Sequence, residues 1–138
     1  MMVEVIYYSM TGNTKKLAEA IATELNVAAE SVSMNTKLAD QSLLFLGTGL
    51  YGPFQGRGLK RFIHGNHFEG RKVALFGTSG EGKGREVGAL EGAVTKKGAA
   101  VVGKFHCKGE FLFFINRKHP MSKDLKGARN FARQLADG

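Results

Sequence analysis

The sequence predicts an α/β fold in which a parallel sheet carries helices on both faces. Short, almost continuous apolar runs alternate along the chain with segments whose apolar residues recur at helical spacing. Polar or glycine-rich turns follow the apolar runs. Such alternation predicts a parallel sheet, because each right-handed crossover lays its helix back on the sheet. With 138 residues, 43% of them hydrophobic, we expect one domain over residues 1–138.

The first half of the chain contains three predicted strands and two predicted helices. The apolar and aromatic run over residues 3–8 predicts a strand buried on both faces. Residues 17–25 carry apolar side chains at helical spacing. A weak strand is predicted over residues 28–34 and a strong one over residues 43–46. A short helix is expected around residues 59–63.

The second half repeats the alternation. Residues 73–76 predict a strand that ends at Gly77, and residues 87–97 predict a helix with basic residues at its C-terminal end, where the helix dipole favours them. A fifth strand is expected over residues 99–105, resuming over 111–115. Ser122 and Asp124 then open a last helix that extends to Leu135.

Ligands of this architecture bind beyond the carboxyl ends of the strands, which directs attention to residues 9–14, 47–52 and 77–82. The first segment, Ser-Met-Thr-Gly-Asn-Thr, offers three hydroxyls, one carboxamide and a glycine at the start of a helix. Hydroxyls, helix N–H groups and the positive dipole end favour a phosphate. Without a P-loop lysine the segment suits a terminal phosphomonoester. The alternative is a simple helix N-cap.

The S/T-x-T-G-x-T pattern that starts at Ser9 resembles the phosphate-binding loop of flavodoxins. Residues 71–80 are similar to the fourth strand and following loop of short-chain flavodoxins, and residues 122–135 to their closing helix. The resemblance covers essentially the whole chain. It implies a three-layer, flavodoxin-like fold, a five-stranded sheet in the order 2-1-3-4-5, one FMN held non-covalently at its carboxyl edge, and electron transfer between larger redox proteins.

The resemblance also implies a set of cofactor-binding residues in three segments. Those expected at the phosphate are Ser9, Met10, Thr11, Gly12, Asn13 and Thr14. Those expected around the flavin ring are Thr48, Gly49, Leu50, Tyr51, Gly52, Thr78, Ser79, Gly80, Glu81 and Gly82. Tyr51 is the aromatic candidate for one flavin face, and the segment 78–82 contains no aromatic residue.

The charge of the chain is strongly positive, since 20 Lys and Arg residues against 12 Asp and Glu residues give a formal net charge of +8. The basic residues are scattered in pairs, with neither zinc-finger spacing nor an RNA-recognition aromatic motif, so a nucleic-acid partner is disfavoured. A solvated surface or an acidic redox partner explains the charge better. No apolar run approaches the roughly 20 residues that span a bilayer. We expect a cytoplasmic monomer without a signal peptide.

Two motifs suggest other chemistry. Residues 47–52 match G-x-G-x-x-G, but a dinucleotide site belongs in the first strand-to-helix turn, so NAD binding there is disfavoured. Cys107 beside His106 lacks a second cysteine, and adjacent strand residues point to opposite faces, so we expect no catalytic or metal-binding role. Two alternative functions remain: an FMN-dependent NAD(P)H:quinone or flavin reductase, and a cofactor-free binding module.

Overall fold

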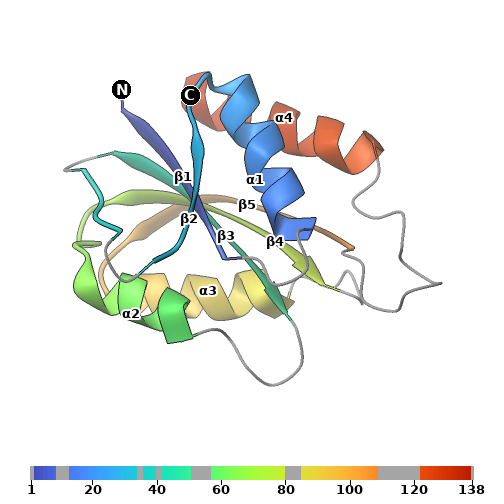
Figure 1. Ribbon diagram of the computed structural model, residues 1–138. Helices are drawn as coiled ribbons and strands as arrows, with labels where there is room; N and C mark the ends of the chain where they lie inside the picture. Colours follow the sequence, from blue (N-terminus) through green and yellow to red (C-terminus); the bar gives the residue numbers. More distant parts are fainter. Residues whose placement is uncertain are drawn as a thin grey trace.

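The computed structural model describes residues 2–8, 13–33, 36–39, 42–50, 57–79, 85–108 and 122–137. Strands and helices alternate along these residues as the sequence predicts, except that among the described residues β3 follows β2 with no helix between them (Figure 1). In chain order they are β1 (Val3–Tyr7), α1 (Asn13–Glu24), β2 (Ala29–Ser31), β3 (Leu43–Leu50), α2 (Arg57–Gly65), β4 (Lys72–Ser79), α3 (Arg85–Lys96), β5 (Ala100–Lys108) and α4 (Ser122–Asp137).

The strands form a five-stranded sheet in the order β2-β1-β3-β4-β5, and every neighbouring pair is parallel. Helices α1 and α4 cover one face, and α2 and α3 cover the other (Figure 1). The fold class and the strand order predicted from the sequence are therefore confirmed. Because the strands are parallel, all their carboxyl ends lie at the same edge of the sheet, and the helices that follow β1, β3 and β4 begin near that edge.

Two central strands are longer than their apolar runs predict. β3 continues through Gly47 to Leu50, and β4 continues past Gly77 to Ser79. These extensions pair with each other in unbroken register, for example Thr48 with Gly77 and Gly49 with Thr78. Ladder hydrogen bonds use backbone groups alone, so glycine and threonine sustain the strand where the apolar pattern stops. The strand predicted to resume over residues 111–115 lies outside the described residues.

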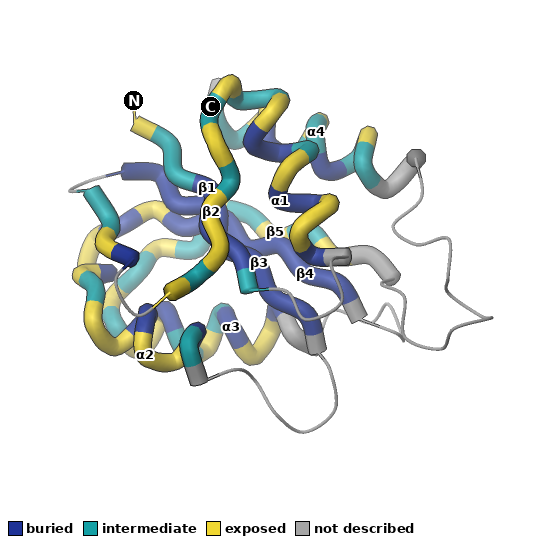
Figure 2. Tube along the Cα trace, viewed as in Figure 1, coloured by how far each residue is buried: buried dark blue, intermediate teal, exposed yellow. Residues whose placement is uncertain are grey.

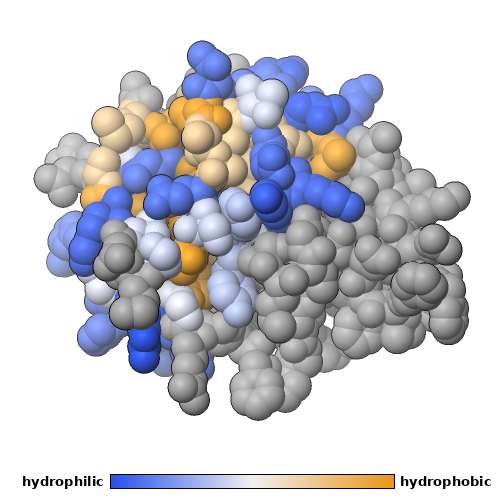
Figure 3. Space-filling view, viewed as in Figure 1, coloured by the Kyte–Doolittle hydropathy of each residue, from blue (hydrophilic) through white to orange (hydrophobic). Residues whose placement is uncertain are grey.

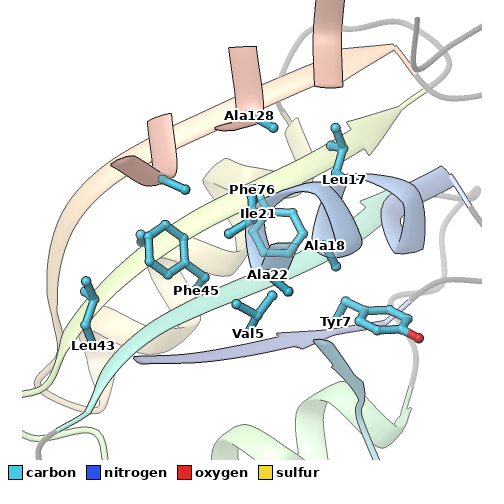
Figure 4. Packing of buried hydrophobic residues seen from close by; sticks show 12 residues of the cluster. Val5, Tyr7, Leu17, Ala18, Ile21, Ala22, Leu43, Phe45, Phe76 and Ala128 are labelled. Carbon is cyan, nitrogen blue, oxygen red and sulfur yellow. The ribbon is translucent and has the colours of Figure 1, made fainter. Parts of the chain in front are cut away.

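Each face of the sheet carries its own apolar core, and the strands β1, β3 and β4 contribute the most deeply buried strand residues (Figure 2). Val5, Phe45 and Phe76 come from three neighbouring strands and pack with Ile21 of α1 (Figure 4). Their sequence neighbours point to the opposite face, where Leu44, Leu46 and Leu75 contact residues of α2 and α3. A strand buried on both faces reads as a continuous apolar run, as the sequence indicates.

The amino edge of the sheet is fixed by a buried polar network. The Arg71 guanidinium donates through Nη1 to Ser42 Oγ at 2.7 Å and through Nε to the His67 carbonyl at 2.9 Å. Ser42 Oγ in turn donates to Glu4 Oε1, which also accepts from the Ala39 amide. Arg71 is only 5% exposed, whereas basic side chains usually lie at the protein surface. The network ties the starts of β1, β3 and β4 together, opposite the candidate site.

Among the described residues, no helix combines the length and the hydropathy that crossing a bilayer requires. On the face seen in Figure 3, hydrophilic side chains lie over much of the described surface, with apolar ones between them. In the described part of the chain, the large hydrophobic side chains of Met2 and Val102 are exposed.

Candidate functional site

The candidate site lies at the carboxyl edge of the sheet, where three of its segments meet. β1 pairs with β3 so that Tyr7 lies opposite Gly47, and the Tyr8 amide donates to the Gly47 carbonyl at 3.0 Å. β3 pairs with β4 so that Gly49 lies opposite Thr78. The ends of β1, β3 and β4 are thus adjacent, and α1, the next element along the chain after β1, begins at Asn13.

A buried pair of hydroxyl groups joins the first turn of α1 to the end of β4. Thr14 Oγ1 lies 2.8 Å from Thr78 Oγ1, and both residues are fully buried. On α1, Thr14 precedes Leu17, Ala18 and Ile21 at the spacing of one helix face, so it continues the buried face of the helix towards the site. On β4, Thr78 lies two residues beyond Phe76 and faces the same helix.

The end of β3 carries small residues beside this hydroxyl pair. Gly47 and Gly49 lie on the sheet face that α1 covers, because Phe45 on that strand packs against the same helix. A Cβ at Gly47 would meet the Phe76 ring at 2.1 Å, so the aromatic ring occupies that space. Thr48 points to the opposite face, is buried, and its Oγ1 lies 3.4 Å from the Gly49 carbonyl oxygen.

The electrostatics of this edge favour an anion. The first turns of α1 and α2 contain no acidic residue, although acidic residues are the ones that the positive end of a helix dipole prefers. The exposed residues Lys15 and Lys16 occupy the first turn of α1, and the exposed Lys60 lies in the first turn of α2. Positive side chains therefore add to the positive ends of two helices at this edge.

A model of the family described as "Flavodoxin domain" matches residues 4–112 of the chain. The chain belongs to the flavodoxin family. The flavodoxin of Clostridium beijerinckii is 31% identical over 110 residues, which cover 72% of this chain and 80% of the relative. A solved flavodoxin from the domain Archaea superposes with a TM-score of 0.76 at 21% identity, covering 99% of this chain and 97% of that one.

A second solved relative is the flavodoxin of Megasphaera elsdenii in its two-electron reduced form. It superposes on this flavodoxin-family chain with a TM-score of 0.68 at 28% identity, covering 96% of this chain and 99% of the other. The resemblance stated from the Ser9 motif is thus confirmed at the level of the family and of the fold.

The described residues contain part of the site that the sequence predicts for this flavodoxin. Thr14, Thr48, Gly49 and Thr78 lie at the carboxyl edge, as do the backbones of Asn13, Leu50 and Ser79. The other predicted cofactor-binding residues lie outside the described part of the chain; they are Ser9, Met10, Thr11, Gly12, Tyr51, Gly52, Gly80, Glu81 and Gly82. Their roles stay predictions.

Two features at the carboxyl edge of the sheet are not predicted from the sequence. Lys15 and Lys16 are exposed in the first turn of α1. Basic residues are unfavourable at the positive end of a helix dipole, and this is the signal in the sequence that could have identified them as candidate site residues. The direct bond between Thr14 and Thr78 carries no local signal, because 64 residues separate the two hydroxyls.

Two further observations concern the other chemistry that the sequence suggests. No group of three or more His, Cys, Asp or Glu residues in that part could hold a metal ion. Cys107 lies on β5, at the edge of the flavodoxin sheet, and its Cα is in register with Thr78. His106 is exposed.

Proposed function

We propose that this flavodoxin-family chain binds one FMN non-covalently at the carboxyl edge of its sheet and carries electrons between redox partner proteins. The observation that supports the proposal most strongly is the buried hydroxyl pair of Thr14 and Thr78 at the start of α1. Buried hydroxyls at the start of a helix add neutral polar groups to the positive end of the helix dipole, which suits the phosphate of FMN without a metal ion.

The residues at this edge fit such a cofactor in two respects. The phosphate would be held by the start of α1, including the Thr14 hydroxyl, where no acidic side chain of the first turn opposes an anion. The flavin ring would lie against the ends of β3 and β4, where Gly49 presents no side chain beside Thr78. Bound FMN supplies one-electron and two-electron redox chemistry.

The relatives support the redox part of the proposal. The Megasphaera elsdenii flavodoxin was solved in a two-electron reduced form, and this chain is 28% identical to it. By analogy, we infer that the present chain accepts and releases electrons through its cofactor rather than converting a substrate of its own. The sequence contains no constellation of nucleophile, base and acid that would argue for a separate reaction.

The partner proteins that fit best are acidic where they meet the site. Lys15, Lys16 and Lys60 are exposed at the helix starts that border the carboxyl edge. The chain as a whole carries a net charge of +8. A positive surface around the site attracts a negatively charged partner surface and raises the rate of encounter.

The absorption spectrum of the reconstituted protein tests this function. Apoprotein mixed with FMN and passed through a desalting column should keep a flavin spectrum at one FMN per chain. The loaded protein alone should oxidise NADPH and NADH no faster than free FMN does, and should be reduced rapidly once a flavodoxin reductase is added. Fast oxidation of NAD(P)H by the loaded protein alone would contradict electron carriage and favour the quinone or flavin reductase.

A further inference from the structure

The exposed side of α2 carries basic side chains. Lys60, Arg61 and His64 are exposed, whereas Phe62 between them is buried. Residues three and four apart lie on the same side of a helix, so the three exposed side chains form one strip, which we call the basic face of α2. No Asp or Glu occurs in residues 41–68, so α2 has no acidic residue of its own to offset these charges.

The position of Lys60 is unfavourable for the helix itself. Lys60 lies in the first turn of α2, which contains no acidic residue, and the positive end of the helix dipole disfavours a cation there. In the described part of the chain, no carboxylate forms an ion pair with Lys60. The stability of the fold therefore does not explain a lysine at this position.

The middle of the exposed side of α3 consists of small residues. Gly88, Ala89 and Gly92 are exposed in the interior of this helix. A Cβ added at Gly88 or Gly92 would meet nothing within 4 Å, so the packing of the chain does not require glycine at either position. Glycine is less favourable than alanine inside a helix. A second protein that approaches the backbone of α3 closely would explain both glycines.

Both features belong to the same layer of the molecule. α2 and α3 cover one face of the sheet (Figure 1), and Lys97, which follows α3, donates through Nζ to the His64 carbonyl of α2 at 3.1 Å. The layer therefore combines projecting cations on α2 with a low surface on α3. Residues that lower the stability of an element without a packing reason are expected where a protein binds something else.

We propose that the layer of α2 and α3 is the docking surface for the redox partner, and that the partner presents carboxylates to the basic face of α2. The inference rests on the proposed function, because this partner exchanges electrons with the bound FMN. α2 follows β3 and begins near the carboxyl edge of the sheet, so a partner on this surface lies beside the candidate site. Complementary charges orient the two proteins, and the small residues of α3 allow close contact.

Calorimetric titration of the FMN-loaded protein with an acidic ferredoxin tests the docking surface. A ferredoxin of this kind is a small iron–sulfur protein whose surface is rich in carboxylates. Lys60→Glu with His64→Glu places two carboxylates on the basic face of α2. At low ionic strength this double variant should bind the ferredoxin about tenfold more weakly than the unmodified protein does, and the difference should disappear at high salt.

Lys126→Glu with Asn130→Asp is the matched control on α4, which covers the other face of the sheet. Its two positions are exposed and four residues apart, as Lys60 and His64 are, and it changes the formal net charge equally when histidine is counted as neutral. It should weaken binding no more than about twofold. The proposal is overturned if both double variants bind equally weakly, if neither is weakened, or if the unmodified protein does not bind the ferredoxin at low ionic strength.

NMR of the unmodified, FMN-loaded protein gives a second measurement that needs no substitution. On addition of the ferredoxin, the amide resonances of α2 and those of Gly88 and Gly92 in α3 should shift most. Shifts confined to α1 and α4 would refute the docking surface. Failure of the chain to bind FMN would refute the proposed function, whereas a loaded protein that meets the ferredoxin through α1 and α4 refutes only this inference.

Discussion

Gly47 is a residue whose identity is set by packing rather than by a ligand. The G-x-G-x-x-G pattern of residues 47–52 suggests glycines that let a cofactor approach the backbone. In the structure the ring of Phe76 fills the space beside Gly47, with its Cε2 atom 2.1 Å from where a Cβ would lie. A glycine in a strand that ends at a binding site can therefore serve the core.

Gly47→Ala should lower the free energy of unfolding by about 1–3 kcal/mol, because the added methyl group forces the buried Phe76 ring to move. Urea unfolding of the apoprotein measures the change. Gly92→Ala is the matched control on an exposed position of α3, where nothing lies within 4 Å of an added Cβ. It should raise helix stability by about 0.5–1 kcal/mol. Equal effects of the two variants would contradict this account.

Contacts between residues that are distant in sequence are not predicted from local sequence patterns. The motif of residues 9–14 predicts an anion site because several donor types converge before a helix, but it does not reveal that Thr14 bonds to Thr78. Arg71 is adjacent to Lys72 in a chain of scattered basic pairs, yet it is buried and bonded to Ser42. Contacts between distant segments depend on strand register, which local patterns do not contain.

Element boundaries were predicted well where apolar periodicity defines them and poorly where backbone pairing does. The apolar run that predicts β1 ends within one residue of the observed strand. The glycine and threonine of residues 47–50 and 77–79 predict the end of each strand, whereas the structure continues β3 to Leu50 and β4 to Ser79. The strand order followed from the family resemblance, since periodicity alone does not say which strands are neighbours.

At the same scale, an ion pair links the end of α1 to α4 and makes that contact sensitive to pH. Arg133 lies 3.1 Å from Glu24 Oε2 through Nη2 and donates to it through Nε at 3.2 Å. This hydrogen bond, aided by the charges of Arg133 and Arg129, lowers the pKa of Glu24 from its usual value. A carboxyl group with a lowered pKa stabilises the fold above its unfolded pKa, and this stabilisation is lost as the pH falls through the folded pKa.

Glu24→Gln should therefore lower the Tm at pH 7, and the difference from the unmodified protein should shrink as the pH falls below about 4. Thermal unfolding between pH 7 and pH 3 measures it. Glu19→Gln removes the same charge from an exposed position of α1 and controls for net charge. A difference that persists unchanged at pH 3, or an identical profile for Glu19→Gln, would argue against the ion pair.

On the scale of the whole molecule, exposed lysines lie at both edges of the sheet. Lys15 and Lys16 lie at the carboxyl edge of the sheet, whereas Lys72 begins β4 and Lys96 ends α3 at the opposite edge. All four are exposed. Of these two pairs, only Lys15 and Lys16 border the proposed cofactor site. Two double variants with the same net charge, one at each edge, can therefore separate attraction of the partner to the site from the effect of the net charge.

Lys15→Glu with Lys16→Glu should slow reduction by an acidic partner about tenfold at low ionic strength, and the difference should disappear at high salt. Lys72→Glu with Lys96→Glu changes the net charge equally and should slow the reaction much less. Stopped-flow reduction over a salt series gives both rates. Equal slowing by the two double variants would mean that net charge alone governs the encounter.

Titration of FMN fluorescence with apoprotein shows whether the carboxyl edge of the sheet holds one FMN. Binding at a site built from α1, β3 and β4 should quench the fluorescence at micromolar concentration, with an end point of one FMN per chain. Riboflavin should bind more weakly, because it lacks the phosphate that the start of α1 favours. Unquenched FMN fluorescence at those concentrations would contradict the account.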